Sequence, residues 1–168
     1  AKGTPVISNW PSASPIIYGQ ALSNSVLSAG SANVPGAFAW VNPTNQPNSG
    51  TSSQSVSFTP TATSNYNGVT SNINVVVNKA SPVLSWTPSP AASLTYPAPL
   101  SSTQLNATSS VAGTFIYNPS SGTILNAGTN QLVATFTPTD TASYSTGGTI
   151  TNSVVVVKAT PTITWTNP

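Results

Sequence analysis

The sequence predicts an all-β chain of two tandem antiparallel β-sandwiches, followed by the first strand of a third unit. Short β-branched and aromatic runs recur at strand spacing, clusters of Pro, Gly, Asn and Ser separate them, and the whole pattern repeats after about 78 residues. Such a period is too long for a solenoid or propeller unit and fits one small sandwich per repeat. No apolar stripe has the spacing of a helix.

Seven runs have the β-branched or alternating pattern of strands. In chain order they cover residues 4–8, 38–41, 56–59, 73–77, 115–117, 132–136 and 154–157. The first four fall in the first repeat and the last three in the second. Each is short and ends at a turn-forming cluster, as expected for strands joined by tight connections.

A lysine followed by a Pro-containing segment opens each repeat, at Lys2, Lys79 and Lys158. The pattern predicts a first sandwich over residues 1–78, a second over 79–157, and an orphan strand within 158–168 that belongs to a following unit or pairs with another subunit. The short Pro-containing joints predict a fairly stiff rod.

Apolar residues that match between the repeats are expected in the two cores. They are Ile7, Tyr18, Leu22, Leu27, Phe38, Phe58, Tyr66 and Val75 in the first, and Leu84, Tyr96, Leu100, Leu105, Phe115, Phe136, Tyr144 and Val155 in the second.

Four segments of the second repeat, residues 96–107, 113–119, 135–140 and 157–161, resemble the bacterial immunoglobulin-like repeats of large secreted and cell-surface, adhesin-like proteins. The resemblance covers essentially the whole chain and is looser in the first repeat, where residues 45–48 replace the 122–125 stretch. It implies immunoglobulin-like sandwiches that serve as a spacer or stalk, and it brings no catalytic residues.

Charge is nearly absent: Lys2, Lys79, Lys158 and Asp140 are the only charged side chains, while Ser and Thr fill 52 of 168 positions. Without Arg, Glu, His or Cys, the chain cannot form a catalytic triad, a carboxylate pair or a His/Cys metal site. We therefore expect no enzyme activity and no cofactor. Three scattered lysines also make no basic patch, so nucleic acid is not an expected partner.

The low charge favours an extracellular or cell-surface location, because cytosolic domains usually carry about a quarter charged residues. No apolar run is long enough to predict a membrane span. The chain contains no Met, which we interpret as the mark of a processed or excerpted part of a larger exported protein.

Asp140 and Tyr144 form a D-x-A-x-Y pattern that resembles the tyrosine corner of immunoglobulin folds, and Tyr66 is the matching tyrosine of the first repeat. The alternative, a calcium site at Asp140, lacks a second carboxylate. Asn106 begins the one N-glycosylation sequon that we identify.

Tryptophans recur at one repeat position, as Trp10, Trp86 and Trp165, and are expected either to pack against each unit or to stack on sugars. Trp40 alternates with Phe38, and its face is not predicted.

Three functions remain open. The first is a spacer or scaffold segment of a surface protein, next to other immunoglobulin-like domains. The second is the subunit of an extracellular filament, in which a strand adds to an identical subunit. That strand consists of Thr160, Pro161, Thr162, Ile163, Thr164 and Trp165. The third is a carbohydrate-binding module for surface glycans.

Overall fold

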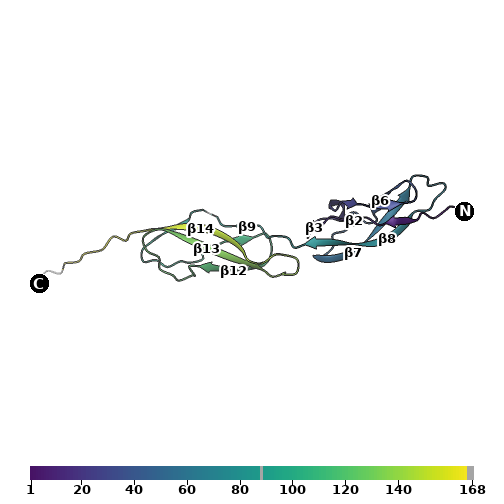
Figure 1. The fold of residues 1–168 in the computed structure, drawn as a ribbon. Helices are drawn as coiled ribbons and strands as arrows, with labels where there is room; N and C mark the ends of the chain where they lie inside the picture. Colours follow the sequence, from purple (N-terminus) through teal and green to yellow (C-terminus); the bar gives the residue numbers. More distant parts are fainter. Residues whose placement is uncertain (88, 166–168) are drawn as a thin grey trace. The chain divides into compact units, whose positions relative to one another are not determined.

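The computed structural model describes residues 1–87 and 89–165. These residues form an all-β structure without an α-helix, as the sequence predicts, and they divide into two compact units. The first unit comprises Ala1–Ala80 together with Ala142–Tyr144, and the second comprises Ser81–Thr141 and the chain from Ser145 onward. Each unit contains a curled four-stranded sheet (Figure 1).

In the first unit the sheet has the order β3-β8-β7-β6, and the short ribbons β1–β5 and β2–β4 accompany it. The long strands β7 and β8 form its centre. The elements are β1 (Ile7–Asn9), β2 (Ser12–Ala13), β3 (Ile16–Ile17), the 3-10 turn η1 (Leu22–Asn24), β4 (Leu27–Ser28), β5 (Ser31–Ala32), β6 (Gly36–Trp40), β7 (Gly50–Pro60) and β8 (Val69–Asn78).

The second unit repeats this plan, with sheet order β10-β14-β13-β12 and one ribbon, β11–β9. Figure 1 shows β12, β13 and β14 side by side. The elements are β9 (Leu84–Ser85), β10 (Ala91–Thr95), β11 (Thr108–Ser109), β12 (Gly113–Asn118), β13 (Gly128–Pro138) and β14 (Gly148–Val157).

The sheets are not purely antiparallel, which corrects the antiparallel expectation. β3 pairs parallel with β8, with Ile16 opposite Val77, and β10 pairs parallel with β14, with Thr95 opposite Val157. Parallel neighbours need a long connection, and in each unit the other strands of the sheet supply it. The parallel strands β3 and β8, and likewise β10 and β14, therefore point in the same direction and finish at the same end of their sheet.

Two core predictions are wrong. Val155 is exposed, while its neighbours Val154 and Val156 are buried, because side chains alternate between the faces of a strand. The register places Gly50 opposite Val77 and Gly128 opposite Val156, so that Val156 corresponds to Val77 and Val154 to Val75. The error was one residue in the alignment of the repeats.

The second wrong prediction is Tyr96, whose side chain is 45 % exposed. Tyr96 follows the last paired residue of β10 and therefore lies at the end of the sheet, beyond the strands that would cover it.

Each unit has its own buried cluster. In the first it consists of Ile16, Leu22, Trp40, Val56, Val75 and Val77. In the second it consists of Trp86, Ala91, Leu100, Leu105, Ala107, Leu125, Leu132, Ala134, Val154 and Val156. Both clusters draw on the alternate residues of the two central strands, which is the pattern of a sheet with one buried face.

A buried phenylalanine lies under a glycine in both units. Phe136 of β13 is 1 % exposed, faces Phe115 of β12 in the register, and has its ring centroid 4.8 Å from that of Phe115. Gly113, at the start of β12, lies so close to Phe136 that a Cβ would overlap its ring and the carbonyl oxygen of Thr137. The first unit places Gly36 over Phe58 in the same way.

We predict that Gly113→Ala destabilises the second unit by about 1–3 kcal/mol, the usual cost of overpacking, because the added methyl group meets Phe136 and backbone. Urea unfolding followed by circular dichroism measures the change. The matched control is Gly148→Ala, whose added Cβ finds only ordinary contact with Leu84, at 3.5 Å. Equal stability of the two variants would contradict the close packing of Gly113 on Phe136.

Candidate functional site

The strongest candidate site in the second unit lies where three chain segments meet at the end of its sheet. The parallel strands β10 and β14 finish together at the pair Thr95–Val157, and Tyr96 continues this contact by donating its backbone N–H to the carbonyl oxygen of Val157, at 2.9 Å. Lys158 follows β14 directly. The third segment contains Ala127, the residue just before β13 begins.

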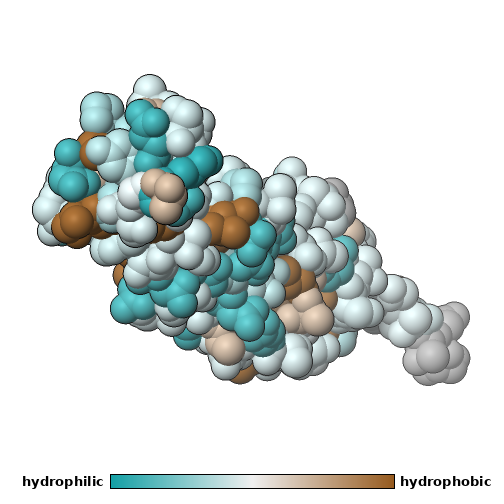
Figure 2. All heavy atoms as spheres, turned by 90° about the vertical axis from the view of Figure 1, so that its right-hand side faces the viewer, coloured by the Kyte–Doolittle hydropathy of each residue, from teal (hydrophilic) through white to brown (hydrophobic). Residues whose placement is uncertain are grey.

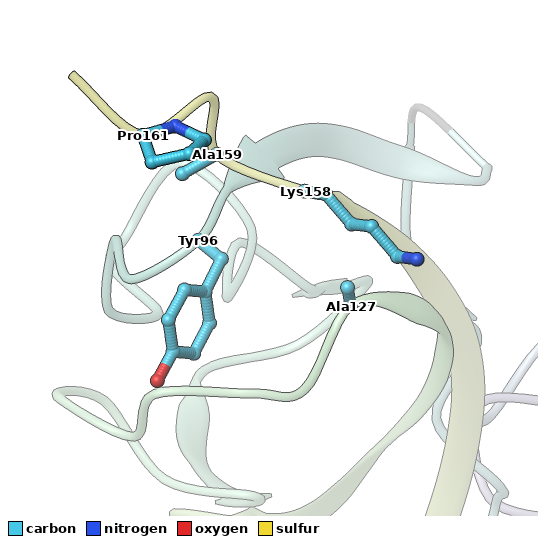
Figure 3. Close-up of a pocket in the computed structure, with 5 residues that line it drawn as sticks. All are labelled: Tyr96, Ala127, Lys158, Ala159 and Pro161. Carbon is cyan, nitrogen blue, oxygen red and sulfur yellow. The ribbon is translucent and has the colours of Figure 1, made fainter. Parts of the chain in front are cut away.

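These segments border a shallow, open pocket of about 510 Å³, lined by Tyr96, Ala127, Lys158, Ala159 and Pro161 (Figure 3). The Tyr96 hydroxyl and the Lys158 ammonium point away from each other, so mainly carbon atoms border the space between them. The volume lies within the usual range of ligand pockets. Because mainly carbon atoms border the pocket, it suits an aromatic or aliphatic group better than an anion.

A glycine next to the pocket fixes its edge. Gly128, the residue after Ala127, has φ +123°, a conformation that side-chain-bearing residues rarely adopt. Gly50 has φ +113° at the start of β7 in the first unit. The turn into the central strand is therefore built in the same way in both units.

A second pocket, also of about 510 Å³, lies in the first unit at the start of β6 and the end of β7. Val34, Pro35, Thr61, Ala62 and Tyr66 line it. The backbone N–H of Thr61 donates to the carbonyl oxygen of Pro35, at 2.9 Å, and closes this end of the β6–β7 hairpin.

Tyr66 and Tyr144, predicted as tyrosine-corner residues, occupy equivalent places. Tyr66 forms a parallel bridge with Gly3, and Tyr144 forms one with Ala80, so each tyrosine is tied to the opening segment of its own repeat. Asp140 is exposed and lies two residues after the end of β13. The corner itself stays a prediction.

The candidate inter-subunit strand, Thr160 to Trp165, has no strand or bridge assigned to it. Ile163 is 89 % exposed and Trp165 is 86 % exposed, and Figure 1 shows this segment running away from the strands of the second unit. Strand formation there stays a prediction. The last part of the predicted 158–168 segment, residues 166–168, lies outside the described residues. Asn106, the candidate glycosylation site, is exposed in the loop before β11.

Trp86 and Trp10 pack within their units. Trp86 is 4 % exposed, donates its indole N–H to the carbonyl oxygen of Gln104 at 2.8 Å, and meets Tyr117 edge-on at 5.4 Å. Trp10 is half-buried and meets Phe38 edge-on at 5.7 Å. Because the Trp86 ring is buried, it has no face open to a sugar.

Trp40, whose orientation the sequence left open, points into the core. It is buried, and its indole N–H donates to the carbonyl oxygen of Ser25 at 3.0 Å. In the first unit, therefore, an indole on β6 donates a hydrogen bond to a loop carbonyl oxygen. In the second unit the donating indole lies in the segment after β9.

Tyr117, which matches Trp40 in the second repeat, is the one tyrosine with a resolved change in acidity. Burial raises the pKa of its hydroxyl above the ordinary value of 10.0, and the hydrogen bond from the backbone N–H of Ala107 opposes this rise. That bond is 3.0 Å long. The hydroxyl serves as a structural acceptor.

Figure 2 shows hydrophobic residues as separate spots on the face in view. Residues 1–87 and 89–165 contain no group of three or more His, Cys, Asp or Glu side chains that could hold a metal ion. No helix in that part of the chain has the length and apolar character to cross a membrane. Comparison with protein-family models and with curated proteins finds no match for this sequence.

We predict that Trp86→Phe lowers the free energy of unfolding by about 1–3 kcal/mol, because it leaves the Gln104 carbonyl without its donor and empties part of the core. Urea unfolding measures the change. Trp165→Phe, which alters an exposed ring of the same type, should leave stability unchanged. A stability loss at Trp165, or none at Trp86, would contradict these environments.

Tyr117 makes a prediction about alkaline pH. Its pKa is higher in the folded state, so folding favours the protonated hydroxyl; this stabilisation is complete below pH 10 and is lost as the pH rises through the folded-state value. The Tm of the second unit should therefore fall more steeply with rising pH in the wild type than in Tyr117→Phe. At neutral pH the variant should be less stable by about 1 kcal/mol, because it loses the hydrogen bond to Ala107. Parallel pH profiles would contradict this role.

Proposed function

We propose that the chain is a non-enzymatic, structural segment of an extracellular surface protein, in which each unit is an immunoglobulin-like sandwich that serves as a spacer. The observation that carries this proposal is the repetition of one sheet plan, with equivalent strands in the same order and one parallel edge, in two units that each have a separate core. Repeated units with their own cores suit a scaffold better than a single active centre.

The sandwich is supported by what lies opposite the first sheet. Ala13 of β2 and Leu27 of β4 pack against the cluster to which Val56 and Val75 of the sheet contribute. This packing of β2 and β4 on the buried cluster supports a second layer of the kind that a sandwich has.

The scarcity of charge on the surface supports the extracellular location of this spacer. Four charged side chains in 168 residues leave a hydroxyl- and amide-rich exterior. The sequence has no His, Cys or Glu and a single Asp, so it lacks the side chains that metal and acid–base centres usually combine.

We predict that single-molecule stretching of the chain gives two unfolding events of about 25 nm each, because each unit of nearly 80 residues extends by about 3.6 Å per residue less its folded length. Gly113→Ala should weaken only one of the two events. A single event spanning both units would argue against independent spacer modules.

The second candidate function is a filament subunit joined by strand addition, and the exposed Ile163 and Trp165 favour it. An unpaired segment with β-forming residues can add to a sheet edge of another molecule. Electron microscopy should then show fibres for the wild type and none for a variant with Ile163→Asn and Trp165→Asn. Fibres that persist in that variant would remove this candidate. A sugar-binding function loses support from the burial of Trp86.

A further inference from the structure

We propose that the pocket lined by Tyr96, Ala127, Lys158, Ala159 and Pro161, called the Tyr96 pocket or socket below, receives the segment Ser64–Tyr66 of a second copy of this chain. Copies would then associate head to tail, with Tyr66 of one copy bound in the socket of the next. The inference goes beyond the spacer function and does not need the C-terminal segment to form a strand.

The first step is that the first unit already holds such a segment. Residues Ala142–Tyr144 come from the second repeat but belong to the first compact unit. There the ring of Tyr144 meets the ring of Tyr18 edge-on, with centroids 5.5 Å apart and planes at 80°. The Ser49 hydroxyl donates to the carbonyl oxygen of Ala142, at 2.5 Å.

The second step is that the Tyr96 pocket is the same socket in the second unit. Tyr18 and Tyr96 each follow the parallel edge strand, and each donates its backbone N–H to the last residue of the neighbouring strand, Asn78 or Val157. Ser49 and Ala127 each precede the glycine that opens a central strand. Ala159 and Pro161 repeat Ala80 and Pro82.

The third step is that the two sockets differ in occupancy. Tyr18 is half-buried, and Tyr144 covers it. Tyr96 is 45 % exposed and borders an apolar space of about 510 Å³. Ala127 in place of Ser49 lacks the hydroxyl that binds the Ala142 carbonyl, so this socket offers the incoming tyrosine mainly apolar and ring contacts (Figure 3).

The fourth step is that the first repeat carries a counterpart of Tyr144, the half-buried Tyr66, which borders a pocket. Tyr66 occupies the same position, with the same parallel bridge to the opening segment of its repeat. It lines the pocket of the first unit beside Thr61 and Ala62, and the preceding Ser64 and Asn65 are exposed. Tyr66 of one copy is thus available to the Tyr96 socket of another.

This contact joins two different surfaces, the first unit of one copy and the second unit of the next. Such a heterologous interface leaves one free socket and one free tyrosine on every assembly, so it can continue along a line of copies. Lys158 is the one charged side chain among the residues that line the two pockets, so the contact contains no pair of opposite charges and should depend little on salt.

Sedimentation velocity of the full chain, at concentrations rising to millimolar, tests the proposal. The wild type should form dimers and longer species. Tyr96→Ala, which removes the socket ring, and Tyr66→Ala, which removes the inserted ring, should each weaken self-association about tenfold or more. Ile116→Ala, a change at an exposed side chain that lines neither pocket, should leave it unchanged.

Mixing the two variants separates this inference from damage to folding. Tyr96→Ala retains Tyr66, and Tyr66→Ala retains the socket, so an equimolar mixture should form a one-to-one dimer and stop there. A monomeric wild type, or a mixture that stays monomeric, would overturn the proposal. The Ile163→Asn and Trp165→Asn variant should still associate; loss of association there, with Tyr96→Ala unaffected, would overturn the socket and assign assembly to strand addition.

Discussion

One contact recurs in both units and sets how closely β6 packs on β7 and β12 on β13: a buried phenylalanine beneath a glycine. Phe58 and Phe136 are almost fully buried, and Gly36 and Gly113 leave room for their rings. The ring opposite each, from β6 or β12, is held at under 5 Å. Each pair holds the edge strand β6 or β12 against the central strand β7 or β13, whose alternate residues Val56, Leu132 and Ala134 enter the two cores.

In both repeats a loop carbonyl oxygen beside the core needs a hydrogen-bond donor, and the two repeats supply it from different residues. A loop carbonyl beside the core accepts an indole N–H in both units, but the donor is Trp40 from β6 in the first and Trp86 from the segment after β9 in the second. Tyr117 takes the place of Trp40 and accepts a backbone hydrogen bond instead. Large aromatic side chains with one polar atom suit such a position because they fill volume and satisfy a backbone group together.

The sequence predicted a part of each long strand, since β-branched and aromatic runs such as residues 132–136 are a local property. It missed the full extent of these strands, and the run of four valines at 154–157 did not show which of them face the core. The two-residue strands and the parallel edges were not predictable in this way, because they depend on segments far apart in the chain. The same holds for the Tyr96 pocket, whose walls come from residues 96, 127 and 161. Tyr96 itself matched Tyr18 and was therefore expected in the core; a one-dimensional pattern does not show that the sheet ends there.

The C-terminal segment also bears on how the molecule could be processed. The peptide bond after Lys79 enters a bridged segment, where the N–H of Ala80 donates to Ser143, whereas the bond after Lys158 enters a segment to which no strand or bridge is assigned. Exposed backbone of the second kind is the preferred substrate of proteases. A lysine-specific protease would thus cut after Lys158 before it cuts after Lys79, and would remove Ala159, Pro161, Ile163 and Trp165 in one step, leaving both sheets intact. Limited proteolysis would then trim one wall of the pocket while sparing the fold.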